Sequence, residues 1–148
     1  MSFNYNGDEA VSGSFGKVYM DGREIAEIEE FEMKGKLESK EFKLYGGETA
    51  TKNTGIKNEI KLKMKKVFSY ELDILKNMKN GKLNTFCTLN IQIDDPEALG
   101  AEAIAINNAK FIGDIDFGSF KRGELIDREF TLTALTKNIE ILESIELI

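Results

Sequence analysis

Apolar and polar residues alternate with a period of two along most of this chain, a pattern typical of β-strands that bury one face. Between residues 31 and 37 the odd positions are apolar or glycine and the even positions are charged. Ile60, Leu62 and Met64 alternate in the same way with lysines. Similar patterns predict strands over residues 15–20, 23–28, 87–93, 101–113, 114–120 and 126–134. We therefore predict a mostly β fold, a β-sandwich or barrel of about seven or eight antiparallel strands in one domain over residues 1–148.

Turn-forming residues divide these strands. Asp21 and Gly22 lie between two strand-like runs and predict a two-residue hairpin, because a type I′ turn needs positive φ at both central residues. Phe42 and Leu44 fall on the opposite parity to the apolar residues before them, which predicts a bulge or bend near Ser39. Two further turns are predicted, over residues 94–100 and 121–124.

One segment, residues 69–81, predicts an α-helix that flanks the sheet. Ser69 can cap the first turn, and Gly81 can end the helix in the left-handed conformation. Acidic residues in the first turn and lysines in the last turn complement the helix dipole. Leu72, Leu75 and Met78, with Ile74 beside them, form the stripe that we expect to pack on the sheet.

Three polar segments are expected to project from the domain. They are an N-terminal arm over about residues 1–14, a protruding loop over residues 46–55 and a C-terminal tail over residues 137–148. The long strands around the loop predict a protruding hairpin whose tip is too polar to be shaped by its own packing. The tail alternates apolar and acidic residues, which fits a strand, a short helix or an arm onto a neighbour.

The composition excludes several classes of function. The chain has 148 residues, 20 basic and 26 acidic residues for a net charge of −6, no histidine and one cysteine. Without histidine it cannot build a Ser-His-Asp or Cys-His catalytic centre, and with Cys87 alone it cannot form an internal disulfide. The first residues lack the basic start and apolar run of a secretion signal, and no apolar stretch approaches the ~20 residues of a membrane span. We expect no membrane partner.

The remaining candidates for chemistry have simpler structural explanations. Asp94, Asp95, Glu97 and Glu102 could form a metal or acid–base cluster, but they lack EF-hand spacing and suit a turn at a strand end. Cys87 could be a nucleophile, but it has no histidine partner, and its parity with neighbouring apolar residues predicts a buried thiol. We therefore predict that the chain is not an enzyme and has no catalytic residue, cofactor or metal.

A stripe of charge follows the predicted loop, on the wet face of the next strand. It consists of Lys57, Glu59, Lys61, Lys63 and Lys65. These lysines could track a nucleic-acid backbone, but no aromatic residues interleave with them, as a single-strand platform needs. We favour a solvated, charge-pairing strand whose lysines pair with Glu32 and Glu38 on a neighbouring strand, or with acids of a neighbouring subunit.

The order of features resembles the tail tube proteins of contractile-tailed phages, in the group of PBSX-like prophages and R-type bacteriocins. No single motif carries the resemblance, which runs through an ordered set of segments over nearly the whole chain. These segments are residues 12–22, 29–31, 54–57, 66–69, 79–82, 94–96, 123–126 and 129–131. The resemblance implies a barrel-like subunit with one flanking helix, six of which close a ring, and rings that stack into a tube.

The same resemblance implies partners and a location. The partners are further copies of the chain, a tail sheath protein, a tape measure protein and baseplate proteins, with DNA only as passing cargo. The location is a virion tail or tail-like particle that is assembled in the bacterial cytoplasm and released on lysis. Ring stacking needs segments that order on contact, and the three candidates are the protruding loop, the polar N-terminal arm and the C-terminal tail. The loop residues expected at contacts between subunits or rings are Gly46, Gly47, Glu48, Thr49, Thr51, Lys52, Asn53, Thr54 and Gly55.

Other functions stay open at this point. A tube protein of a type VI-like or extracellular contractile injection system would share the fold. A small-ligand-binding β-barrel would need an apolar interior cavity. A metal-dependent enzyme is the alternative that the residues favour least.

Overall fold

The computed structural model describes residues 4–147 and confirms the mostly β fold, with eight strands and one α-helix in the described residues. Residues 1–3 of the predicted N-terminal arm and Ile148 of the tail lie outside the described residues. The strands are β1 (Gly16–Met20), β2 (Arg23–Glu24), β3 (Ile28–Lys43), β4 (Thr49–Lys65), β5 (Phe86–Ile93), β6 (Glu102–Ile112), β7 (Asp127–Ala134) and β8 (Ile139–Glu143). The helix is α1 (Tyr70–Lys79), and the short 3-10 helices are η1 (Gly13–Phe15) and η2 (Thr136–Asn138).

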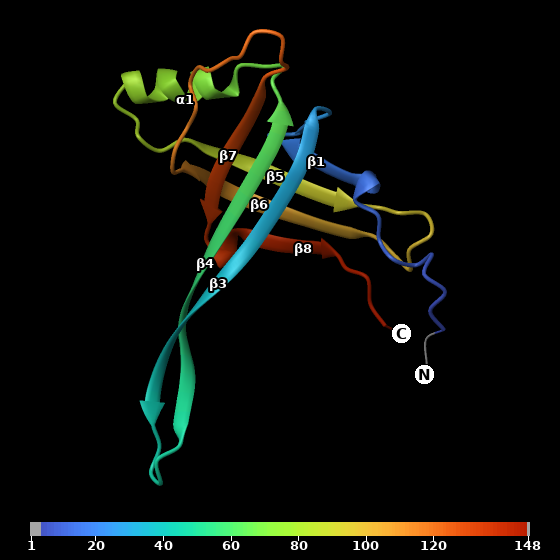
Figure 1. The fold of residues 1–148 in the computed structure, drawn as a ribbon, viewed down its shortest axis with the longest axis vertical. Helices are drawn as coiled ribbons and strands as arrows, with labels where there is room; N and C mark the ends of the chain where they lie inside the picture. Colours follow the sequence, from blue (N-terminus) through green and yellow to red (C-terminus); the bar gives the residue numbers. More distant parts are fainter. Residues whose placement is uncertain (1–3, 148) are drawn as a thin grey trace.

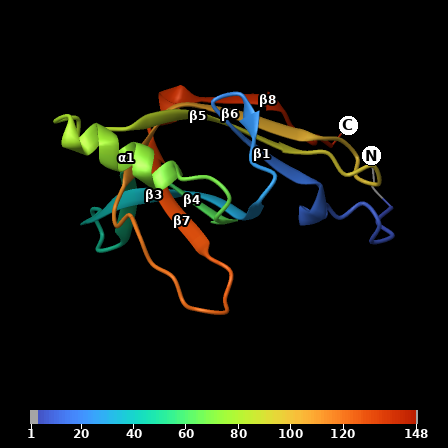
Figure 2. The ribbon, with the colours of Figure 1, turned by 90° about the horizontal axis from the view of Figure 1, so that it is seen from above.

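All of these strands belong to one antiparallel sheet that folds over into two layers. The strand order is β2-β1-β5-β6-β7-β4-β3, and β8 pairs with β6 beside this path. Figure 2 shows β1, β5, β6 and β8 in one layer and β3, β4 and β7 in the other, with the strands of the two layers crossing. Strand β6 joins the layers, because its first half pairs with β8 and its last residues pair with β7.

The core lies between the two layers and follows the predicted alternation. Ile60, Leu62 and Met64 of β4 are at most 1% exposed, whereas the lysines between them reach solvent. Phe130 of β7 packs edge-on against Phe111 and Tyr70, so it links both layers to the helix. The tail, for which strand, helix and arm were all open, starts with the last two residues of η2 and continues as strand β8.

The local turn predictions for β1–β2 and for the long hairpin are confirmed. Asp21 and Gly22 have φ angles of 51° and 84° and connect β1 to β2. The register of β3 and β4 shifts between Glu38 and Ser39, so that Thr54 of β4 has no residue opposite it on β3. This is the bulge that the change of parity predicts.

The protruding loop is shorter than predicted. Residues 49–55 belong to β4, and the turn is confined to residues 44–48, with hydrogen bonds between Leu44 and both Glu48 and Gly47. Gly46 and Gly47 have φ angles of 103° and 92°, which side-chain-bearing residues rarely adopt. The result is a two-stranded hairpin that projects far beyond the body of the domain (Figure 1).

The predicted strand over residues 114–120 is wrong, because this segment has no strand pairing. Gly113 has a φ of 74°, and the Asp116 carboxylate accepts a hydrogen bond from the Gly118 backbone N–H at 3.0 Å. Side-chain caps of this kind satisfy the backbone locally and compete with a strand ladder. The predicted turn at residues 121–124 is present, as Glu124 N–H donates to Lys121 at 3.2 Å, but it does not join two strands of a hairpin.

Helix α1 lies at one end of the two layers and differs from its prediction in the face that it buries. Its buried residues are Glu71 and Ile74, whereas Leu72 and Met78 of the predicted stripe are 40% and 39% exposed. Ser69 precedes the helix, but its side chain makes no capping hydrogen bond. The orientation follows from ion pairs to Glu71, which no apolar periodicity signals.

The two ends of the described chain lie near each other. Figure 1 shows the first and last parts of the described chain, coloured blue and red, at the end of the β1-β5-β6-β8 layer that is farthest from α1. The arm before β1 is held there by a hydrogen bond from Ser12 N–H to the Asp95 carboxylate at 3.0 Å. The tail after β8 lies close by, since a Cβ added to Gly100 would lie 3.5 Å from Ile145 Cγ1.

Candidate functional site

The long β3–β4 hairpin is the first candidate surface, and it leaves the sheet at Asn58. Asn58 is 7% exposed, and its Nδ2 donates to the Ala134 carbonyl and to Thr136 Oγ1, both at 3.0 Å. Its carbonyl accepts from Thr133 Oγ1 at 2.8 Å. Gly35 lies opposite in register, where a Cβ would come within 3.3 Å of Asn58 Oδ1. Asn58 shares the parity of the buried residues of β4, which is the signal that sequence reasoning overlooked.

Beyond Asn58 the hairpin has two strands and little cover. Leu37 and Ile56 pair across it and are 57% and 51% exposed. Phe42 and Leu44 are also about half exposed, and Tyr45 at the turn is fully exposed. A two-stranded hairpin alone is marginally stable in water, and clustered exposed apolar side chains mark contact surfaces.

The structure gathers the predicted assembly residues on this hairpin. Gly46, Gly47 and Glu48 form the turn, and the remaining six residues, from Thr49 to Gly55, lie along the first half of β4. The bulge among them is held by two hydrogen bonds, from Ser39 Oγ to Asn53 at 2.7 Å and from Thr54 Oγ1 to the Glu38 carbonyl at 3.3 Å. Their role in assembly stays a prediction.

The second candidate surface is the solvent-facing side of β3, β4 and β7, which we call the mixed-charge face. The register places Lys63 between two acidic residues, with Glu30 opposite it on β3 and Glu129 opposite it on β7, whereas Lys61 has an acid, Glu32, on the β3 side only. Lys65 contacts Glu29 at 3.1 Å and Asp127 at 2.6 Å. The face carries six lysines and six acidic residues: Lys34, Lys36, Lys57, Lys61, Lys63, Lys65, Glu29, Glu30, Glu32, Glu59, Asp127 and Glu129.

The ion pairs on this face shift the pKa values of their members. Hydrogen bonds to Asp127 and Glu29 raise the pKa of Lys65. The hydrogen bond between Lys65 and Asp127 also lowers the pKa of Asp127. Lys34 contacts Glu32 at 2.6 Å, which lowers the pKa of Glu32 and raises that of Lys34. All four groups therefore hold their charges over the whole neutral pH range.

Two of the predicted pairings differ in detail. Glu32 lies opposite Lys61, but its ion pair is with Lys34, and the ion pair of Lys61 is with Glu59 at 3.6 Å. Glu38 lies opposite Gly55 and not opposite a lysine, so its predicted pairing is wrong. The bulge that follows Glu38 ends the regular register beyond that point.

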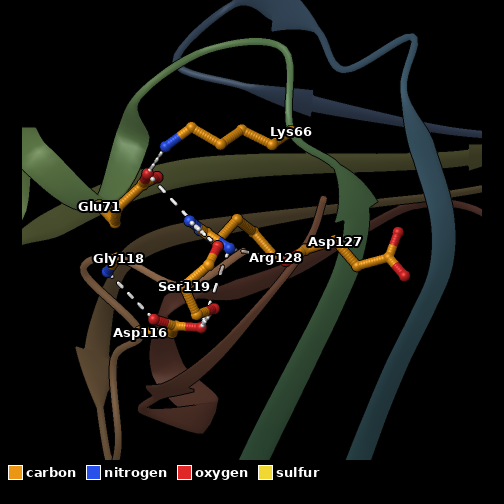
Figure 3. Close-up of polar contacts among 7 residues, drawn as sticks. All are labelled: Lys66, Glu71, Asp116, Gly118, Ser119, Asp127 and Arg128. Carbon is orange, nitrogen blue, oxygen red and sulfur yellow. Dashed lines mark hydrogen bonds and ion pairs between the residues drawn. The ribbon is translucent and has the colours of Figure 1, made fainter. Parts of the chain in front are cut away.

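A buried ionic cluster fixes the end of the domain beside α1 (Figure 3). Glu71 has no exposed side-chain surface, and it pairs with Lys66 and, at 3.5 Å, with Arg128 Nε. Burial raises the pKa of Glu71, but the Lys66 hydrogen bond and the Arg128 charge outweigh burial, so the pKa lies below its usual range. Arg128 also approaches Asp116 at 3.8 Å and donates to the Ser119 carbonyl at 3.4 Å.

This cluster holds three parts of the chain together. It ties the helix to β7 and to the irregular segment that contains Asp116 and Ser119. Sequence reasoning missed both Glu71 and Arg128, although Arg128 has the parity of the buried residues of β7. The available signal was a charged residue at one of the alternating positions of a strand that are otherwise buried.

The candidate reactive residues Cys87 and Asp95 occupy structural positions. Burial, with a smaller contribution from Asp21, raises the pKa of Cys87 to about 12, which confirms the predicted buried thiol. The Asp95 carboxylate accepts from the backbone N–H groups of Ser12 and Glu97, each at 3.0 Å. Among residues 4–147, no group of three or more acidic or cysteine side chains is placed to hold a metal ion. No helix of the described chain is long and apolar enough to cross a membrane.

Comparison with known proteins gives a family and a fold. The family model described as "Phage tail tube protein" matches residues 4–143. No curated protein sequence matches the chain.

Three of the solved structures that resemble this chain come from an extracellular contractile injection system and from the anti-feeding prophage. The sheath/tube terminator of an extracellular contractile injection system shares 13% identity with a TM-score of 0.67, covering 96% of this chain and 100% of its own. The tube-terminating cap of the anti-feeding prophage shares 12% identity with a TM-score of 0.64, covering 97% and 95%. A sheath-tube complex of the injection system contains a chain with 13% identity and a TM-score of 0.62, covering 91% and 93%. These likenesses show a common fold.

Proposed function

Because this chain belongs to the phage tail tube protein family, we propose that it polymerises as stacked hexameric rings into the inner tube of a contractile phage tail or phage-tail-like bacteriocin. At the coarser level, the chain is a structural component of a tail or tail-like particle. The particle is assembled in the bacterial cytoplasm and released on lysis. No enzymatic activity, cofactor or membrane partner belongs to this function.

The observation that carries the proposal is the uncovered β3–β4 hairpin. It projects from the body of the domain, exposes apolar residues such as Leu37, Ile56 and Phe42, and has no strand on the outer edge of β3 within residues 4–147. An open strand edge of this length is a template for pairing with another chain. Contact with a neighbouring copy covers both the edge and the apolar side chains. The turn and bulge residues, from Gly46 to Gly55, then lie at contacts between subunits or rings.

The mixed-charge face suits the wall of a conduit. Lys63 and Lys65 have acids on both neighbouring strands and Lys61 has Glu32 opposite it on β3, so acids interrupt the positive charge that this part of the face presents to a phosphate backbone. Lys36 and Lys57 lie opposite each other on the hairpin, beyond the part of β4 that pairs with β7. DNA passes along such a wall as cargo without specific binding, and a bacteriocin tube passes no DNA. The outside of the tube contacts a tail sheath protein, its lumen holds a tape measure protein during assembly, and its end joins the baseplate.

A second candidate is the tube of an extracellular contractile or type VI-like injection system. The fold relatives described above favour it, since they are parts of an extracellular contractile injection system and of the anti-feeding prophage. Particles purified from producing cells separate the two candidates. A phage tail is attached to a DNA-filled capsid, whereas an injection system or bacteriocin is not.

Electron microscopy of the purified protein tests the proposal. Discrete rings or hollow rods of uniform diameter are expected as protein concentration rises. Class averages of the rings viewed end-on report their symmetry, and six-fold symmetry is the expected result. A protein that stays monomeric at millimolar concentration contradicts the proposal, and so does a ring of another symmetry for its hexameric part.

A further inference from the structure

Charge is distributed unevenly between the two ends of the β1-β5-β6-β8 layer, although Lys17 pairs with Gln92 near one end and Asp21 and Asp73 lie near Phe86 at the other. One end, which we call the acidic end, consists of residues 4–12, 94–102 and 140–147 and has no basic residue. Its acidic residues are Asp8, Glu9, Asp94, Asp95, Glu97, Glu102, Glu140, Glu143 and Glu146. The lysine end carries Lys76, Lys79, Lys82, Lys110 and Lys137, and the segments 74–93, 103–113 and 130–139 that contain them have no acidic residue.

The fold places these two groups at opposite ends of the same strands. At the start of β5, Phe86 pairs with Lys110, and at its end Ile93 pairs with Glu102. The end of α1 joins the lysine end, because Asn77 Nδ2 donates to Thr85 Oγ1 at 3.1 Å, just before β5. Strand β8 leads the tail towards the acidic end, as the arrows in Figure 1 show. An eight-residue strand separates the two ends by roughly 25 Å.

Neither group of charges is neutralised within the described chain. The ion pairs among residues 4–147 lie on the mixed-charge face or in the cluster around Glu71, and none involves a residue of either end. The two ends point away from each other, so one copy cannot pair them internally. A second copy, placed end to end with the first, supplies the opposite charge for each.

Apolar surface accompanies the charge at both ends. A groove of about 550 Å³ at the lysine end is lined by Phe86, Leu135, Lys110 and Lys137 among others, and Phe86 and Leu135 are 53% and 61% exposed. In the tail, Ile141, Leu142 and Leu147 are 57–79% exposed and are interspersed with Glu140, Glu143 and Glu146. An acidic, apolar strand segment therefore has the chemistry that the lysine-rimmed groove can bind.

We propose that the acidic end of one copy, led by residues 140–147, docks into the lysine-rimmed groove of the next copy. The inference rests on the proposed function and assigns the contact that closes the ring. Such a contact joins two different surfaces, and contacts of this type generate rings when the rotation closes. In Figure 1 the line between the ends runs across the direction in which the hairpin projects. Ring closure and ring stacking therefore use different surfaces of the subunit.

Charge reversal tests this pairing. Variant A carries Lys110→Glu and Lys137→Glu, and variant B carries Glu143→Lys and Glu146→Lys. Each variant alone places like charges together at every contact, so the concentration needed for ring formation rises at least about tenfold at 0.15 M salt. The control carries Lys121→Glu and Arg122→Glu, which changes the net charge as variant A does but at an exposed turn outside both ends, and it assembles like the unmodified chain.

Rescue makes the test specific. An equimolar mixture of A and B forms rings, because each reversed end meets a complementary end when the two variants alternate. A single chain with all four substitutions also assembles, since both ends are reversed together. Thermal unfolding of each variant shows first that it is folded. The pairing is overturned if A or B alone forms rings at the concentration at which the unmodified chain does. It is also overturned if A and B are folded but do not assemble on mixing. An unmodified chain that forms no rings instead overturns the proposed function, and this inference with it.

Discussion

At the scale of single residues, Asn58 marks the point where the hairpin leaves the sheet. Its side chain is the link between β4 and the segment from β7 to η2, and the side-chain amide satisfies the Ala134 carbonyl at a position closed to water. Removing one partner of a buried hydrogen bond leaves the other unsatisfied and costs more than the bond itself contributes.

We expect Asn58→Ala to lower the free energy of unfolding by about 1–3 kcal/mol, because the Ala134 carbonyl loses its donor. Urea unfolding of the protein under conditions that keep it unassembled measures the change. Asn84→Ala is the control, since Asn84 is exposed and lies in the loop before β5. Equal stabilities for the two variants contradict the role given to Asn58.

The buried ionic cluster makes stability depend on acid pH. The pKa of Glu71 is lowered in the folded protein, so its stabilisation is fully present above the ordinary pKa of a glutamate and is lost as the pH falls through the lowered value. We expect the unfolding free energy to fall between about pH 5 and pH 3, and the fall to be smaller in Glu71→Gln, which has no charge to lose there. Urea unfolding at each pH measures both slopes. Parallel slopes in the two proteins contradict the assignment, and Asp73→Asn on the exposed side of α1 serves as the control.

At the scale of elements, the hairpin is separable from the domain that carries it. Its distal part packs on nothing else within residues 4–147, so its removal leaves the core residues of β3 and β4 in place. A two-residue Asn-Gly turn suits the right-handed twist of the flanking strands.

We expect replacement of residues 40–52 by Asn-Gly, which joins Ser39 to Asn53 across their existing pair, to leave the domain folded and to abolish tube formation. Rings persist if the hairpin serves stacking alone. Circular dichroism measures the fold, and electron microscopy counts rings and rods. Full-length rods from the shortened chain contradict the assembly role of the hairpin. Leu37→Ser with Ile56→Ser tests the same role with a smaller change, because it keeps the hairpin and removes only apolar contact surface.

The elements also show what a sequence can predict. Strands β4 and β7, the Asp21-Gly22 turn and the bulge after Glu38 follow from parity and turn chemistry, both of which are local. The segment 114–120 has the same apolar alternation at Ile115 and Phe117 but closes on itself through Asp116, and helix α1 turns Glu71 inward to meet Lys66 and Arg128. These outcomes depend on partners distant in the chain, which a periodicity does not contain.

At the scale of the whole molecule, the local net charge differs from one surface region to another. The net charge of −6 is a sum over the whole chain. It hides a mixed-charge face whose charges balance, an acidic end and a lysine end. In the tube that we propose, the two ends are buried against each other and the balanced face is presented, so behaviour towards DNA follows the charge of the face and not the total charge.

We expect Glu30→Gln with Glu129→Gln to make assembled tubes retain DNA, because Lys63 then lies between two neutral residues and joins its neighbouring lysines in a positive track. Co-sedimentation of tubes with short duplex DNA at low salt measures retention, which should decline steeply as salt rises. Glu24→Gln with Glu124→Gln changes the net charge equally and lies at exposed positions outside the face and outside both charged ends. Retention that rises equally in both variants contradicts the importance of local balance.

The closeness of the two chain ends has a practical consequence for anyone who labels this protein. A purification tag or fluorescent fusion joined just before residue 4 or just after residue 147 is attached to the acidic end, where it blocks the proposed ring closure and makes an assembling protein look inert. The exposed turn at residues 121–124 lies away from both termini (Figure 1) and carries no strand pairing. An epitope inserted there leaves both ends and the hairpin tip unencumbered.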